Sequence, residues 1–242
     1  MNNDGKSSEA RDKKETANDN FKIDNVNDGS LEFLNNLNAL SVQRELSLCE
    51  ITTGWETENR YTIIDPESGT EIFTAKERSG CCDRNCLGQM RRADIAIANP
   101  NGVEVLHLTR LLRMQYCCCP CCLQKMEVCH PPGNSIGIVR QKWSICHPKY
   151  LVEDKDGNPL YKIKGPIFHC GNVDFEIFDA RPKRENVNEK IGKIKKKWGG
   201  ILKEVCTDYD NFVIEFPDHS SVTEKCLLLG ASFLIDYMYF EC

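Results

Sequence analysis

Short stretches in which apolar and polar residues alternate run from about Val42 to residue 217, and clusters of Asp, Asn, Pro and Gly separate them. Such alternation is typical of β-strands that bury one face, and such clusters join antiparallel neighbours by tight turns. The pairs that we expect to form hairpins are 61–64 with 71–73, 95–97 with 103–108, and 150–152 with 160–163, and residues 173–178 add a further strand. About ten to twelve strands at this spacing predict a mainly β protein, with a closed or nearly closed antiparallel β-barrel.

The last apolar segment predicts a buried helix over residues 224–240, because it is apolar on every side. Fifteen helical residues from Cys226 reach about 22 Å, short of a hydrocarbon core about 30 Å thick, and Asp236 would be costly inside a bilayer. We therefore expect the helix to lie on the barrel axis, with a membrane-spanning anchor as the alternative. The residues that define this buried or membrane helix are Cys226, Leu227, Leu228, Leu229, Phe233, Leu234, Ile235 and Phe240.

Residues 1–30 predict a disordered polar tail. Their few apolar side chains stand among Asn, Asp, Lys and Ser, and cannot bury enough surface to offset the entropy of ordering. Ser30 then caps a short helix that carries Leu31, Leu34 and Leu37. The barrel domain is expected to cover residues 31–242.

The composition narrows the class of protein. With 242 residues and 40% hydrophobic content, the chain can fill the core of one large β domain. A formal net charge of −5 argues against nucleic acid as a partner, because binding phosphates requires an excess of Lys and Arg. No catalytic frame for an enzyme stands out, since the five His are scattered and neither a nucleophile elbow nor a phosphate-binding loop motif occurs.

Fifteen cysteines are unusual for a chain without a secretory signal segment. The odd number and the absence of that signal favour reduced thiols in the cytosol over a disulfide framework. The cysteines are then lipid acceptors, metal ligands or small buried apolar residues.

Several separated motifs resemble the phospholipid scramblase family, between residues 31 and 241. They are Cys117–Gln124, Pro131–Gly133, Gly171–Ile177, Trp198–Ile201, Thr207–Phe212 and Leu234–Phe240. The resemblance implies a Tubby-like fold, in which a β-barrel surrounds a C-terminal helix. It also implies calcium-dependent, ATP-independent, bidirectional translocation of phospholipids between leaflets, at the cytoplasmic face of the plasma membrane. Members with a long N-terminus carry PPxY-type sequences for SH3 and WW partners, and because residues 1–30 contain no proline, those partners are not carried over.

The five clustered thiols resemble the palmitoylation segment of the family; they are Cys117, Cys118, Cys119, Cys121 and Cys122. Two or more acyl chains make membrane anchoring stable. Inert surface thiols and a zinc or iron–sulfur site are the alternatives. The further ligands of such a site would come from Cys81, Cys82, Cys86, Cys129, Cys146 and Cys170.

Residues 208–219 resemble the EF-hand-like calcium loop of the family. The residues that would hold Ca²⁺ are Asp208, Asp210, Phe212, Ile214, Phe216, Asp218 and His219. We expect weak binding, because Val213 stands where an EF-hand requires Gly and His219 stands where the family has an acidic residue. The period of two at residues 212–216 equally fits a strand preceded by an acidic turn.

A basic segment between Arg181 and Trp198 contains eight Lys or Arg and two Glu. It resembles a non-standard nuclear import signal, which implies importin as a partner and the nucleus as a second location when the protein is not acylated. A Lys-rich stretch beside Trp also suits an anionic leaflet, and a solvated strand edge protected by lysine is the alternative. The predicted contact residues are Lys193, Lys195, Lys196, Lys197 and Trp198.

Two functions therefore remain open at the level of the sequence. The first is translocation of phospholipids under calcium control. The second is a peripheral adaptor that binds anionic lipid and can enter the nucleus to act in signalling.

Overall fold

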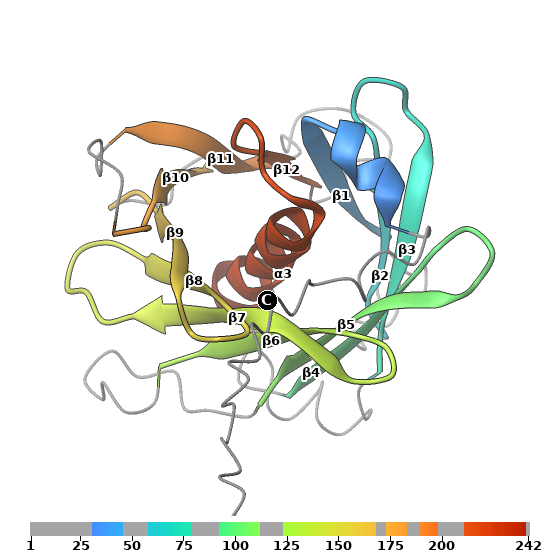
Figure 1. The fold of residues 1–242 in the computed structure, drawn as a ribbon, viewed down its shortest axis with the longest axis horizontal. Helices are drawn as coiled ribbons and strands as arrows, with labels where there is room; N and C mark the ends of the chain where they lie inside the picture. Colours follow the sequence, from blue (N-terminus) through green and yellow to red (C-terminus); the bar gives the residue numbers. More distant parts are fainter. Residues whose placement is uncertain are drawn as a thin grey trace, which may run out of the picture.

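A computed structural model of the chain contains a closed barrel of twelve antiparallel strands (Figure 1). It describes residues 31–45, 58–78, 92–111, 123–167, 173–182, 189–197 and 211–240. The strands are β1 (Ala39–Glu45), β2 (Arg60–Ile64), β3 (Glu71–Glu77), β4 (Ala93–Ala98), β5 (Glu104–Arg110), β6 (Lys125–His130), β7 (Asn134–Lys142), β8 (Lys149–Asp154), β9 (Pro159–Lys164), β10 (Val173–Asp179), β11 (Lys190–Lys197) and β12 (Asn211–Glu215).

Each strand pairs with its neighbours in the chain, and β12 closes the barrel on β1. The predicted hairpins are confirmed as β2–β3, β4–β5 and β8–β9, with register shifts near three of the turns. Buried residues alternate with half-buried or exposed ones along β6 and β10, as expected for strands with one face toward a core. The predicted closed barrel is confirmed, and within it β11 pairs with β10 on one side and with β12 on the other.

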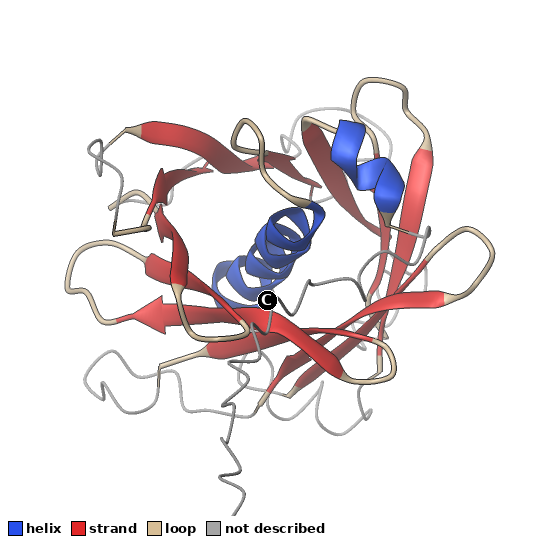
Figure 2. Ribbon diagram, in the orientation of Figure 1, coloured by secondary structure: helices blue, strands red, loops and turns tan. Residues whose placement is uncertain are grey.

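The helix α3 (Val222–Tyr239) fills the interior of the barrel, and Figure 2 shows the ring of strands around it. Every residue from Lys225 to Met238 is buried. The prediction of a buried axial helix is thus confirmed, although the helix begins two residues earlier and Phe240 caps its end. Within the described residues, no helix combines the length and the apolar character that crossing a membrane requires.

Two local features fix the position of α3. Its first turn carries a capping box, in which the Ser221 hydroxyl accepts from the backbone N–H of Glu224 and the Glu224 carboxylate accepts from that of Ser221. Further along, Gly230 lies so close to β6 that a Cβ there would stand 2.6 Å from Cγ2 of Val128. The helix therefore approaches the wall more closely than a larger residue would allow.

The short helix expected near Leu31 is a 3₁₀ helix, η1 (Glu32–Asn36). Leu31 stands at its N-terminal cap without a side-chain hydrogen bond, and Ser30, the predicted cap, lies outside the described residues. Lys225 of α3 donates from Nζ to the carbonyl oxygens of Leu34, Asn35 and Leu37, at 2.8, 3.0 and 2.9 Å. This ammonium group ties η1 to the beginning of the axial helix. The predicted tail, residues 1–30, lies outside the described residues.

Candidate functional site

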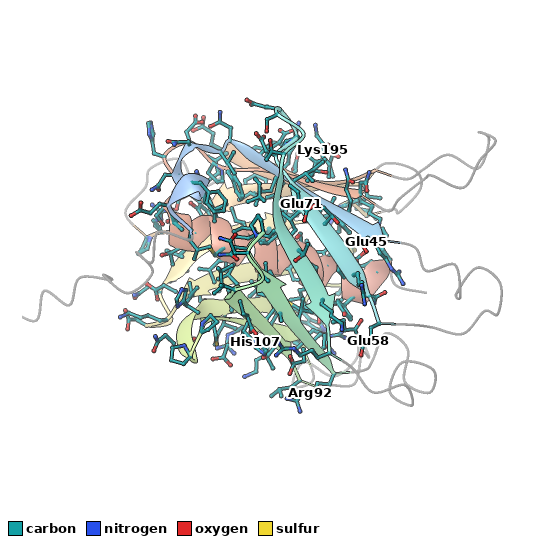
Figure 3. The ribbon with its side chains drawn as sticks, turned by 90° about the vertical axis from the view of Figure 1, so that its right-hand side faces the viewer. Glu45, Glu58, Glu71, Arg92, His107 and Lys195 are labelled. Atoms are coloured by element: carbon teal, nitrogen blue, oxygen red, sulfur yellow. The ribbon has the colours of Figure 1, made fainter. Side chains whose placement is uncertain are left out.

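The connections at the two ends of the barrel differ. At one end, which we call the turn end, short turns follow β2, β4, β6 and β8 (residues 65–70, 99–103, 131–133 and 155–158). At the other end, which we call the connection end, segments of 6 to 15 residues follow β1, β3, β5, β7, β9 and β11, whereas residues 180–189 join β10 to β11 at the turn end. Figure 3 shows Glu45 and Glu58, which flank the first of these segments, at the same end of the barrel. The helix α3 runs from the turn end to the connection end.

Two of the predicted sites belong to segments that join strands at the connection end. The palmitoylation cluster Cys117, Cys118, Cys119, Cys121 and Cys122 falls between β5 and β6, and Trp198, Asp208 and Asp210 fall between β11 and β12. All of these residues lie outside the described residues. The strands on both sides of each segment reach the connection end of the barrel.

The second half of the predicted calcium loop is a strand. Phe212 and Ile214 point into the core from β12, and this strand pairs with β1 and β11. Five extended residues at about 3.3 Å each separate the two ends of β12 by roughly 16 Å. Asp218 and His219 therefore lie at the turn end, far from the segment that contains Asp210, and Phe216 is buried beside them.

The prediction that residues 208–219 form a single loop around one ion is wrong, because β12 occupies the middle of this segment. An EF-hand wraps twelve consecutive residues around its calcium, which an extended strand in the middle does not allow. Among the described residues, no group of three or more His, Cys, Asp or Glu side chains could hold a metal ion. Calcium binding near Asp208 and Asp210 stays a prediction.

The lysine side chains of the basic segment lie on two opposite faces of β11. Lys193 and Lys195 project outward, as Figure 3 shows for Lys195, and their Nζ atoms lie 3.2 and 2.7 Å from the carboxylate of Glu215. The hydrogen bond with Glu215 raises the pKa of Lys195. Although burial alone raises the pKa of Glu215, its hydrogen bonds with the two lysines lower it overall. These two lysines thus share one carboxylate on the neighbouring strand β12.

Lys196 has the opposite orientation and is fully buried. Its Nζ lies 3.3 Å from a carboxylate oxygen of Asp236 on α3, and the hydroxyl of Tyr61 donates to the other oxygen at 3.2 Å. The same ammonium group stands 4.3 and 4.9 Å from the ring centres of Phe212 and Phe240. The prediction that Lys196 contacts lipid or importin is therefore wrong for the folded barrel, and Lys196 instead joins the wall to the axial helix.

The alternative explanation of the lysines as protection of a strand edge is also wrong, because β11 has a neighbour on each side. Only the backbone of Lys197 is described, and Trp198 lies outside the described residues. Sequence reasoning missed the buried pair. A signal for it existed, since Lys196 follows the buried Ile194 by two residues and Asp236 interrupts an apolar helix.

The positions of the described cysteines restrict which of them could be ligands of the alternative zinc or iron–sulfur site. Cys226 is buried in α3, and burial raises the pKa of its thiol to about 12. Cys129 lies near the turn end, because its partner in β7 is Ser135, and Cys146 is exposed at the connection end. Cys129 therefore cannot share a site with a segment at the connection end, whereas the remaining proposed ligands are not described.

The geometry defines a class of protein in which an antiparallel barrel is filled by its own C-terminal helix. A buried ion pair between Lys196 and Asp236 joins the barrel wall to this helix. The family follows from comparison with known proteins. Residues 18–242 match the family model described as Scramblase, and the chain belongs to this family.

Three relatives illustrate the similarity. The chain is 42% identical to phospholipid scramblase 1 of Homo sapiens over 87% of this chain and 65% of that protein. It is 39% identical to phospholipid scramblase 2 of Bos taurus, with 87% and 71% covered, and 38% identical to phospholipid scramblase family member 5 of Homo sapiens, with 87% and 77% covered. The chain thus spans slightly less than two thirds of the first of these relatives. No solved structure matches the chain.

Proposed function

We propose that this protein translocates phospholipids between the leaflets of a membrane, in both directions, without ATP and under the control of calcium. The observation that carries the proposal is the family match over residues 18–242, together with relatives that are named phospholipid scramblases. A transport activity of this kind requires no catalytic group. It requires contact with lipid and a means of switching that contact on.

In this proposal the connection end of the barrel faces the bilayer. Acyl chains on Cys117–Cys122 anchor it at the cytoplasmic face of the plasma membrane, since two or more chains give stable binding. Asp208 and Asp210 provide carboxylate ligands for Ca²⁺ from a segment at the same end. Anchor and calcium ligands thereby act on one face of the protein.

Translocation is tested with the full chain in liposomes that carry a fluorescent phospholipid. Dithionite bleaches only the outer leaflet, so translocation extends bleaching beyond half of the signal. We expect this extension with calcium and its loss after chelation. Bleaching that stops at half in both conditions would exclude the activity.

Calorimetry tests the calcium ligands separately. Replacing both Asp208 and Asp210 with Asn should abolish the heat of calcium binding. Asp218→Asn is the matched control, because Asp218 is exposed at the turn end and should leave the heat unchanged. Equal heats for the double variant and the unchanged protein would remove these residues from the proposal.

The second candidate is a peripheral adaptor that binds anionic lipid and enters the nucleus through importin when it is not acylated. The complete burial of α3 favours it, because the helix in this position offers no apolar surface to a bilayer. Flotation with liposomes in the absence of any extended bleaching would support the adaptor over the translocator.

A further inference from the structure

Three lysines form a row across the outer surface of β7, β8 and β9 at the connection end. Lys142 is the register partner of Lys149, and Lys149 is the register partner of Lys164. Each follows or precedes a residue that points inward, so all three side chains project outward. We call these residues the lysine row. Like charges directly opposite one another destabilise a sheet, so the row carries a cost that the fold alone does not explain.

The lysine row lacks the counter-charges that other lysines on this barrel possess. In the described parts of the chain, none of its three ammonium groups forms an ion pair, whereas Lys193 and Lys195 share Glu215. Glu176 is the register partner of Lys164, but its carboxylate lies 3.2 Å from Nζ of Lys190. The row therefore presents positive charge toward solvent.

Large apolar side chains are exposed beside the row. Trp143, Ile145 and Ile167 are 51%, 83% and 54% exposed, and they belong to the segments that follow β7 and β9. The backbone N–H of Gly165 donates to the carbonyl oxygen of Pro148 at 2.8 Å, which holds these two segments together. Exposed apolar groups of this size mark an interaction surface, and Trp is favoured at the interface between water and lipid.

A cleft of about 300 Å³ opens at the end of the row. Its lining consists of His147, Lys164, Gly165, Pro166, Ile167, Asp174 and Glu176. Nδ1 of His147 is buried and has no hydrogen-bond partner among the described residues. Of the two carboxylates, Glu176 bonds to Lys190 and Asp174 stands opposite Lys195. Lys164, which has no ion-pair partner among the described residues, is thus the group of this lining that could meet an anion.

We propose that the lysine row and the three apolar residues dock on a bilayer that contains anionic phospholipid, and that a headgroup phosphate enters the cleft between Lys164 and His147. The choice of a bilayer as the occupant rests on the proposed function. Lysines attract the anionic surface while Trp143 and Ile145 enter the interface, and this combination distinguishes a membrane from a purely polar partner. The position fits the acylation segment, which joins strands at the same end of the barrel.

Co-sedimentation with vesicles tests this surface in the full chain, produced without acylation. We expect binding to vesicles of phosphatidylcholine with phosphatidylserine, and much weaker binding to phosphatidylcholine alone. Changing all three lysines of the row to Gln should weaken binding about a hundredfold, since each lysine near the surface contributes about fivefold. Higher salt should reduce the difference, because it screens surface charges.

The matched control changes Lys76, Lys193 and Lys195 to Gln, which alters the net charge equally but removes lysines that already have ion-pair partners. This control should weaken vesicle binding less than about tenfold, compared with about a hundredfold for the row variant. A second pair of variants tests the apolar residues: Ile145→Ala should weaken binding, whereas Val103→Ala, 56% exposed at the turn end, should not. Circular dichroism verifies that each variant is folded.

Equal binding by the row variant and its control would overturn the proposal, and so would a failure of the unchanged protein to bind phosphatidylserine vesicles, which would favour a protein partner. These outcomes are separable from the proposed function. Vesicle binding through the row without lipid translocation would refute the translocator and leave the docking surface intact. Translocation that survives loss of the row would refute the docking surface and leave the translocator intact.

Discussion

Replacing Lys196 with Met would test the buried connection between the barrel wall and the axial helix. The change preserves most of the side-chain volume but leaves the carboxylate of Asp236 buried without its cation. Breaking a buried ion pair in this way costs about 3–5 kcal/mol. The hydroxyl of Tyr61 still donates to one carboxylate oxygen, so we expect a loss near the lower limit, about 3 kcal/mol.

Urea denaturation, followed by circular dichroism, measures the change in the free energy of unfolding. Lys195→Met is the matched control, because Lys195 is the preceding residue on the same strand but faces outward toward Glu215. A surface ion pair of this kind contributes less than about 1 kcal/mol. The two variants differ only in which face of β11 they alter.

A double variant completes the test. Changing Lys196 to Met and Asp236 to Leu removes both charges, and replacing a buried pair by apolar groups is often neutral or stabilising. We therefore expect the double variant to recover most of the stability that Lys196→Met loses. If Lys196→Met cost no more than Lys195→Met, or if the double variant were no more stable than Lys196→Met, the pair would not hold the helix as described.

Three further predictions concern stability. Lys225→Met should lower the free energy of unfolding by about 2 kcal/mol, because three carbonyl groups lose their donor, and a loss below about 0.5 kcal/mol would contradict this role. Ser221→Ala should cost about 1 kcal/mol through the lost helix cap, and no change in the urea midpoint would refute the capping box. Burial raises the pKa of Cys226 from 9.0 to about 12, so its contribution to stability is complete below pH 9 and is lost as the pH rises from 9 toward 12. Cys226→Ala should therefore show a smaller loss of stability over this pH range, and an unchanged pH dependence would contradict it.

Much of the barrel could be predicted from the sequence because its information is local. Alternation along Val173–Asp179 reports one buried face, and residues 65–69 and 154–158 carry the chemistry of tight turns. The all-round apolar character of the C-terminal segment, combined with its insufficient length for a bilayer, predicted a helix inside the protein. Each of these inferences depends on neighbours in the chain.

The pairing of distant charges could not be predicted in the same way. Lys196 and Lys195 look alike in the sequence, and only the register of β11 decides that one meets Asp236 and the other meets Glu215. A run of lysines was therefore interpreted as one surface. The lysine row could not be predicted either, because its members are not adjacent in the sequence. They lie on three strands and become neighbours only when the barrel forms.

The most direct test of the central claim is photo-cross-linking of the membrane-bound protein by a phospholipid whose acyl chain carries a photoreactive group. Peptide mapping then identifies which segments touch the lipid. We predict labelling of residues 143–147 and 165–167 at the connection end, and none of Val222–Tyr239, because the barrel encloses that helix. Labelling concentrated on Val222–Tyr239 would show that the helix leaves the barrel on the membrane, and would contradict the account.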